Sequence, residues 1–103
     1  MTRTRLQPEE RRAAILAAAM RLAREQGYTN VRRDAVAVEA DVSAGLVTTY
    51  FSTMAKLRRA IMRAAVAQGV VEIVAQGLAA GDKHAQGADE ALKRKAGEYL
   101  INR

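Results

Sequence analysis

The side chains best suited to chemistry in this sequence are small hydroxyl groups on one short segment. Ser43 precedes Ala44 and Gly45, and Thr48 and Thr49 follow two aliphatic residues later. A hydroxyl group both donates and accepts hydrogen bonds, and small neighbours allow another molecule to approach closely. This segment therefore predicts hydrogen bonding to a partner rather than covalent catalysis.

The inventory of reactive side chains excludes several other kinds of site. The sequence has no cysteine, which excludes disulfides and thiol chemistry, and its single histidine is His84. One histidine among scattered carboxylates makes neither a metal site nor a Ser-His-Asp set. No apolar run reaches the length of a membrane span, and the charged first residues lack the apolar block of a signal peptide. We therefore expect a cytoplasmic protein that is not an enzyme, binds no membrane and uses no cofactor or metal.

The net charge of +6 is concentrated in the first three-fifths of the chain. Residues 1–63 hold 12 Lys and Arg against 6 Asp and Glu, whereas residues 64–103 hold 5 of each kind. A basic part joined to a neutral part predicts a polyanion-binding unit attached to a region with another role. The alternative is an arginine-rich composition whose charges are simply solvated.

Length and composition predict one all-α domain. The chain has 103 residues, half of them apolar, and shows no alternating strand pattern. Alanine, which is abundant here, has the highest helix propensity. A glycine inside a helix costs about 1 kcal/mol relative to alanine, so the fourth expected helix either continues to residue 80 or breaks near Gly69. We expect helices at residues 8–26, 33–40, 44–50, 54–80 and 88–100, with a loop at 81–87.

The short helices expected at 33–40 and 44–50 fit a helix-turn-helix arrangement. Ala37 is small enough for the two helices to cross closely, and Asp41 can adopt the unusual backbone conformation of the turn. The second helix of such a unit presents small polar residues to base edges in the major groove of DNA. The residues that meet this requirement are Ser43, Ala44, Gly45, Thr48 and Thr49.

A longer pattern of small, apolar and aromatic residues extends on both sides of this turn. It comprises Gly27-Tyr28, Val36-Ala37, Ala40, Val42-Ser43-x-Gly45, Tyr50-Phe51 and Leu57. This pattern, which covers roughly residues 12–61, resembles the N-terminal DNA-binding domain of the tetracycline-repressor (TetR) family. The resemblance implies a three-helix bundle whose third helix is the recognition helix. It also implies double-stranded DNA as the partner and a transcriptional regulator, most simply a repressor, on a near-palindromic operator.

Positive charges around the motif are candidates for contacts with DNA phosphates. Arg32 and Arg33 stand at the start of the second helix, and Lys56 stands in the first turn of the fourth. Each of these three either contacts phosphate or lies on a solvated surface. Arg3 and Arg5 belong to a basic arm that either enters a minor groove, as homeodomain arms do, or is disordered without DNA.

The chain departs from the usual TetR pattern at several of these positions. Family members usually carry a tyrosine where this chain has Thr48, and a lysine near the start of the fourth helix where it has Met54. Lys56 is the candidate to replace that lysine from a different face. Tyr50 either contacts DNA or packs in the core, whereas Phe51 is expected in the core.

The C-terminal half is expected to serve dimerisation. We divide the chain into a basic arm (1–7), a helix-turn-helix DNA-binding domain (8–53) and a helical dimerisation region (54–103). The apolar stripes of the last region exceed what a short helix buries alone, and a homodimer is the most economical use for them. A higher oligomer remains open. The expected interface residues are Ile61, Ala65, Val70, Val71, Val74, Leu78, Leu92 and Tyr99.

The region after the recognition helix is short for the TetR family. Only about fifty residues follow Phe51, whereas a drug-sized pocket occupies about 300–1,000 Å³ and needs many lining residues. We therefore expect a reduced regulator without a small-molecule effector, encoded by a bacterium or a phage. The alternative function is a protein-interaction module that pairs with another regulator through its C-terminal helices and inhibits it.

Overall fold

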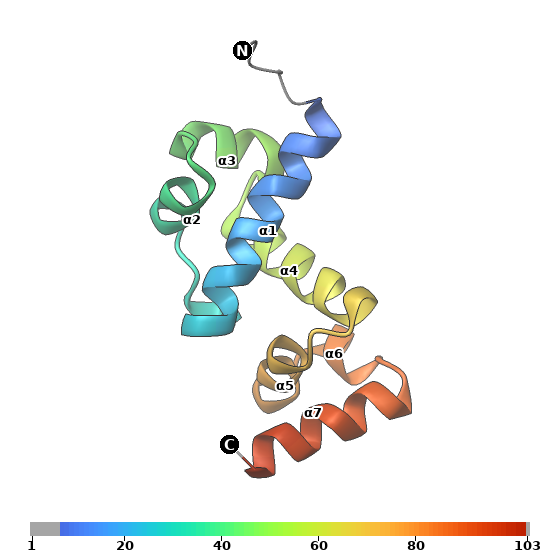
Figure 1. The fold of residues 1–103 in the computed structure, drawn as a ribbon. Helices are drawn as coiled ribbons and strands as arrows, with labels where there is room; N and C mark the ends of the chain where they lie inside the picture. Colours follow the sequence, from blue (N-terminus) through green and yellow to red (C-terminus); the bar gives the residue numbers. More distant parts are fainter. Residues whose placement is uncertain (1–6, 103) are drawn as a thin grey trace, which may run out of the picture.

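The computed structural model describes residues 7–102, and every regular element in that part is helical. The predicted all-α class is therefore confirmed. Figure 1 shows α1, α2 and α3 gathered at one end and α5, α6 and α7 at the other, with α4 passing between them. The molecule is accordingly elongated, with extents of 47 × 24 × 22 Å. The elements are α1 (Pro8–Gln26), the 3-10 turn η1 (Tyr28–Asn30), α2 (Arg33–Ala40), α3 (Ala44–Phe51), α4 (Met54–Gln68), α5 (Val71–Ala80), α6 (Lys83–Gln86) and α7 (Glu90–Asn102).

Local chemistry sets the ends of α2, α3 and α4. Ser43 precedes α3, and its hydroxyl oxygen accepts a hydrogen bond from the Leu46 amide at 3.0 Å. Thr53 precedes α4 and accepts from the Lys56 amide at 3.1 Å. Asp41 ends α2 in the left-handed conformation, with φ 57° and ψ 49°, which aspartate tolerates better than most residues. The predicted turn and the predicted helix starts are thereby confirmed.

The second half of the chain contains more helices than predicted. Helix α4 ends at Gly69, whose φ of 71° is left-handed, so the broken form of this helix is the correct alternative. The predicted loop at 81–87 is wrong, because it contains α6. Asp82 starts α6 by accepting hydrogen bonds from the amides of His84 and Ala85. Burial of Ala85 then fixes this short helix against the core.

One connected apolar core runs through both ends of the molecule. Ile15 from α1, Leu57 from α4 and Ile73 from α5 are all fully buried in it. Met62 of α4 reaches α5 so closely that a Cβ atom added at Gly77 would stand 2.5 Å from its Cε. Helix α4 therefore belongs to the core of both ends, and the position of α1–α3 depends on α5 and α6.

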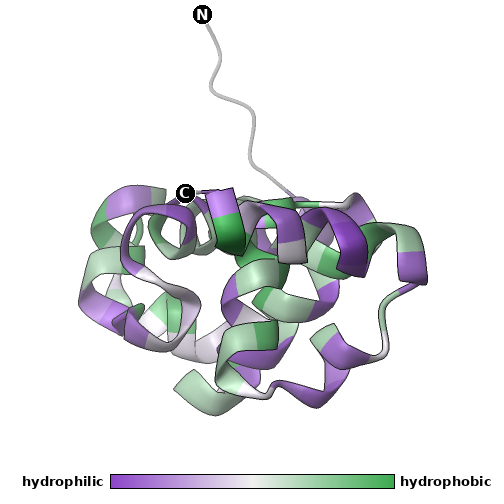
Figure 2. Cartoon of the chain, turned by 90° about the horizontal axis from the view of Figure 1, so that it is seen from below, coloured by the Kyte–Doolittle hydropathy of each residue, from purple (hydrophilic) through white to green (hydrophobic). Residues whose placement is uncertain are grey.

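Three residues expected at a dimer interface lie in this core instead. Ile61, Ala65 and Val74 have no exposed surface within the single subunit, so they are not available to a partner in this conformation. The correction arises because the break at Gly69 folds α5 back against α4. Among the other expected interface residues, Tyr99 is 40% exposed; Val70, Val71, Leu78 and Leu92 are half-buried. Figure 2, which views the α7 end, shows hydrophobic and hydrophilic segments mixed along these helices.

A polar network joins the C-terminal end of α1 to α5 and α6. The Gln76 side chain donates to the Ala23 carbonyl at 2.8 Å and accepts from the Tyr28 amide at 2.8 Å. The Tyr28 hydroxyl donates to an Asp82 carboxylate oxygen at 3.0 Å. Burial, and then the hydrogen bond and charge of Asp82, raise the pKa of Tyr28 to about 12. On the surface, Arg24 pairs with Glu72 at 3.0 Å across the same junction.

None of the helices in residues 7–102 combines the length and the apolar character that crossing a membrane requires.

Candidate nucleic-acid interface

Helix α3 buries one face and exposes the other. Val47 and Phe51 are buried against the core, and this packing turns Gly45, Thr48 and Thr49 outward. Because α3 is only two turns long, its exposed side is a small surface of hydroxyl and methyl groups beside a glycine. Among the other predicted contact residues of this segment, Ser43 is exposed, and Ala44 and Tyr50 are half-buried against the core.

The two threonine hydroxyls of α3 face outward mainly as acceptors. Thr48 Oγ1 donates to the Ala44 carbonyl at 3.3 Å, and Thr49 Oγ1 donates to the Gly45 carbonyl at 3.0 Å. A hydroxyl oxygen engaged in this way keeps acceptor lone pairs, so each can accept from an amino group on a base edge. The Thr49 methyl group can also contact a thymine methyl. Ser43 differs from them, because its oxygen already caps α3.

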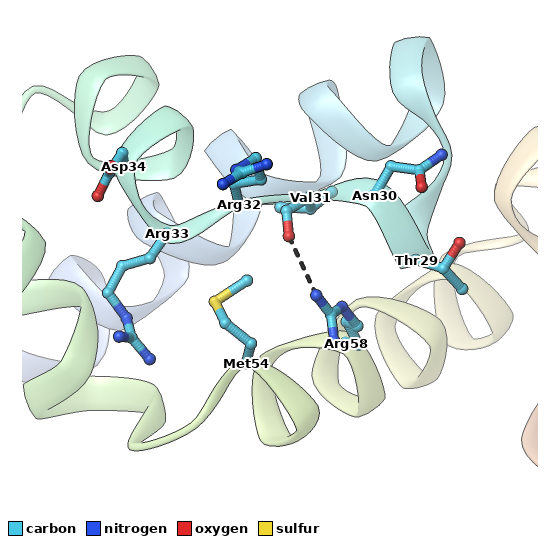
Figure 3. A pocket seen from close by; sticks show the side chains of 8 residues that line it. All are labelled: Thr29, Asn30, Val31, Arg32, Arg33, Asp34, Met54 and Arg58. Carbon is cyan, nitrogen blue, oxygen red and sulfur yellow. Dashed lines mark hydrogen bonds between the residues drawn. The ribbon is translucent and has the colours of Figure 1, made fainter.

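A hollow of about 570 Å³ lies between the start of α2 and α4. In Figure 3, Arg33 and Arg58 enter it from opposite sides, with Met54 between them. One Arg58 amino group donates to the Val31 carbonyl at 3.5 Å. The Nε atoms of both arginines are buried and have no hydrogen-bond partner among the described residues, but the two side chains are only half-buried. The parts of their guanidinium groups that line this hollow suit a phosphate oxygen.

Arg33 also brings this hollow next to the recognition helix. Its side chain lines a narrow gap together with Thr48, Ser52 and Met54. Arg32 is exposed on the rim of the larger hollow. The structure thus joins the predicted pair Arg32 and Arg33 to the exposed end of α3. Arg58 was not predicted from the sequence; its position one turn after Met54, at the start of α4, was the available signal.

Lys56 lies on the other flank of α4, away from Arg33. It lines a second hollow, of about 550 Å³, between α1 and α4. Arg12, Arg59 and Arg63 line the same hollow, and sequence reasoning missed all three of them. The predicted phosphate contacts therefore fall into two separate groups. Arg3 and Arg5 lie outside the residues that the structure describes.

Neither group of cations forms an ion pair with a carboxylate of the described residues, although Asp34 also lines the first hollow. The ion pairs within residues 7–102 join Arg21 to Glu39, Arg24 to Glu72 and Lys93 to Glu90, and none involves a cation of the two hollows. Uncompensated positive charge of this kind attracts a polyanion. In the same part of the chain, no group of three or more His, Cys, Asp or Glu side chains is placed to hold a metal ion.

A comparison with protein families identifies this part of the molecule. The model of the family described as bacterial regulatory proteins, tetR family, matches residues 15–61. That span begins in α1 and ends in α4, so it contains the helix-turn-helix and the cations at the start of α2 and α4. A search of curated proteins and a search of solved structures found no match. The geometry and the family match agree: residues 15–61 form a helix-turn-helix domain of the type found at the N-terminus of tetR-family bacterial regulatory proteins.

Proposed function

We propose that this protein is a sequence-specific transcriptional repressor that binds a near-palindromic operator as a homodimer. The observation that carries the proposal is the exposed face of α3, with its outward threonines beside two groups of unpaired cations. Helix-turn-helix proteins read base edges with residues near the start of the recognition helix and hold the backbone with surrounding cations. Repression would follow if the bound protein blocks access of RNA polymerase to the promoter.

The proposed contacts divide the residues by role. Gly45, Thr48 and Thr49 would face the base edges in the major groove, where they decide sequence preference. Arg32, Arg33 and Lys56 would contact phosphates, which supply much of the affinity but little specificity. Binding should therefore weaken steeply as salt concentration rises, because each phosphate contact releases a condensed counterion.

The homodimer would form through the outer surfaces of α5 and α7. Tyr99 is 40% exposed and Ile101 is 82% exposed near the end of α7. Val71 and Leu78 of α5 and Leu92 of α7 are half-buried. Large apolar side chains at a surface are a typical sign of an interface. A two-fold dimer would place the two copies of α3 about 34–36 Å apart on successive major grooves.

Selection from a random duplex library, followed by sequencing, tests the proposal directly. We expect an enriched two-fold palindrome and a dimer mass by light scattering. Salt-sensitive binding without an enriched sequence would contradict sequence recognition. A monomer mass for both the free protein and its complex with DNA would contradict the homodimer.

The exposed apolar residues at the end of α7 also favour a second candidate function. A protein-interaction module would use Tyr99 and Ile101 to pair with another regulator and inhibit it. This candidate predicts a monomer with no selected DNA sequence. A stable homodimer with a palindromic operator would exclude it.

A further inference from the structure

The exposed face of α4 carries a continuous row of positive charges. Lys56, Arg59 and Arg63 follow one another at helical spacing, and all three are exposed. Arg12 of α1 lies across the hollow that they line. We name these four residues the basic track. It runs along the flank of α4 opposite to the hollow that holds Arg33 and Arg58.

The length of the basic track suits several phosphates of one strand. Seven residues separate Lys56 from Arg63, which corresponds to about 10 Å along a helix axis at 1.5 Å per residue. Phosphates of one DNA strand advance about 3.4 Å along the duplex axis. The track therefore spans roughly three successive phosphates. Because α4 leads away from α3, the far end of the track extends beyond the part of the molecule that faces the major groove (Figure 1).

The near end of the basic track is fixed to the recognition helix. The Arg12 guanidinium lies 4.6 Å from the centroid of the Phe51 ring, and such a cation–π contact holds the side chain in place. Phe51 is the last residue of α3 and is buried. A phosphate bound at Arg12 would therefore have a defined position relative to the bases that α3 reads.

The far end of the basic track continues toward α6. A further hollow of about 410 Å³ is lined by Arg59 and Arg63 together with Lys83 and His84. Asp82 contributes the one carboxylate there, and its oxygens already accept from the Tyr28 hydroxyl and from two backbone amides. Positive charge thus extends over two adjoining open hollows. An extended surface of this kind fits a linear polyanion better than a compact anion.

We propose that the basic track binds the phosphate backbone of duplex DNA outside the segment that α3 reads. This inference rests on the proposed DNA-binding function and adds a contact surface to it. The flanking duplex would lie against α4, with Arg12 and Lys56 nearest to the operator half-site and Arg59 and Arg63 farther out. The contact would add affinity and salt dependence without adding sequence preference.

Duplex length separates this surface from the recognition site. Binding is measured with a duplex limited to the selected operator and with one extended by about ten base pairs, or one helical turn, at each end. The test variant is the double substitution Arg59→Ala, Arg63→Ala. The control is Arg94→Ala, Lys95→Ala, which removes the same charge from exposed positions on α7. Thermal unfolding of all three proteins checks that the substitutions leave the fold intact.

We expect the unmodified protein to bind the extended duplex more tightly than the short one. For the test variant, the slope of log K against log salt should fall on the extended duplex by about 1.8 per subunit, or about 3.6 for the homodimer, at 0.9 per lost phosphate contact. On the short duplex its slope and its sequence preference should equal those of the unmodified protein. The control should match the unmodified protein on both duplexes.

Three results would overturn the proposal. The first is a test variant that behaves like the control on the extended duplex. The second is an equal loss on both duplexes, which would place Arg59 and Arg63 at the operator itself. Competition by ATP at constant ionic strength, without any effect of duplex length, would assign the track to a free phosphate compound. If no sequence is enriched in selection, the proposed function fails. The salt slopes of the unmodified protein and the test variant on a long duplex of arbitrary sequence then decide whether the basic track binds the phosphate backbone.

Discussion

At the scale of single residues, the orientation of a side chain decides its role more than its type does. Thr48 and Thr49 are neighbours of the same type, and both donate back to α3. Thr48 lines a narrow gap together with Arg33, whereas Thr49 is not among the residues that line that gap. We therefore expect Thr48 to face a base edge next to the phosphate contact of Arg33, and Thr49 to face a base edge farther from it.

Substitution of Thr49 tests base recognition. Thr49→Ala should cost about 1–3 kcal/mol at one base pair of the operator and relax the preference there. Affinity for a random duplex should stay unchanged. Repeating the selection with the variant measures both effects, and Thr49→Ser distinguishes the hydroxyl from the methyl group. Equal weakening on operator and random DNA would show that Thr49 does not read a base.

Substitution of Arg58 tests the hollow between α2 and α4. The Arg58 side chain is half-buried and lines this hollow, so we expect the accessible part of its guanidinium group to contact a phosphate of the bound duplex. Arg58→Ala should weaken binding to every sequence and lower the salt slope by about 1 per subunit, or about 2 for the homodimer. Titrations at several salt concentrations measure this, with Arg94→Ala as the control. An unchanged slope would mean that the hollow stays free of DNA.

At the scale of elements, the position of α4 depends on close packing at its C-terminal half. A Cβ atom at Gly77 would lie 2.7 Å from the Ala85 Cβ as well as near Met62. Helix α5 can therefore approach α4 and α6 only because position 77 has no side chain. This packing affects DNA binding indirectly. Lys56 and Arg58 lie near the start of α4, so a shift of α4 would displace both side chains at the DNA-binding end.

Two glycine substitutions should have opposite effects on stability. Gly77→Ala should lower the free energy of unfolding, because overpacking costs about 1–3 kcal/mol and exceeds the gain in helix propensity. Gly97→Ala in α7 meets nothing within 4 Å, so it should raise that free energy by about 0.5–1 kcal/mol. Urea unfolding of both variants gives the comparison. Stabilisation by Gly77→Ala would mean that α5 and α6 move apart easily.

At the scale of the whole molecule, the DNA-binding end and the C-terminal helices are joined by partly buried polar contacts as well as by the core. Gln76 bridges the end of α1 and the start of η1. Tyr28 extends the connection to Asp82 at the start of α6. These contacts fix the angle between the two ends, and in a dimer that angle would set the spacing of the two recognition helices.

Removing the bridge should loosen the junction. Gln76→Ala leaves the Tyr28 amide without its acceptor. The Ala23 carbonyl, by contrast, keeps its hydrogen bond from the Gly27 amide. Loss of a partner for a buried amide costs about 1–3 kcal/mol. Gln68→Ala, at the exposed end of α4, is the matched control with little expected effect. Thermal unfolding measures the difference. The same melting temperature for both variants would show that the bridge contributes nothing to stability.

The same junction should make stability fall at high pH. The pKa of Tyr28 is raised to about 12 from about 10 in an unfolded chain, so the folded protein holds this proton more tightly. The resulting stabilisation is complete below about pH 10 and is lost as pH rises toward 12. Unfolding across this range, compared with Tyr28→Phe, measures it. A near-ultraviolet titration should lose its component near pH 12 in the variant; its persistence would refute the assignment.

The sequence by itself determined the features that depend on near neighbours along the chain. The all-α class, the bounds of α1 and α2 and the left-handed turn at Asp41 follow from propensity and local hydrogen bonds. The outward position of Thr48 and Thr49 follows from helical spacing and the buried Val47. The low helix propensity of glycine also left two alternatives for α4, which either continues to residue 80 or breaks near Gly69.

Only the tertiary structure decided what lies exposed and which distant residues meet. It broke α4 at Gly69, formed α6 from an expected loop, and buried Ile61, Ala65 and Val74 inside one subunit. It also brought Arg33 to Arg58, and Arg12 to Arg63. The physical reason is that exposure and long-range proximity depend on how helices pack, and the same apolar stripe fits either a subunit core or an interface.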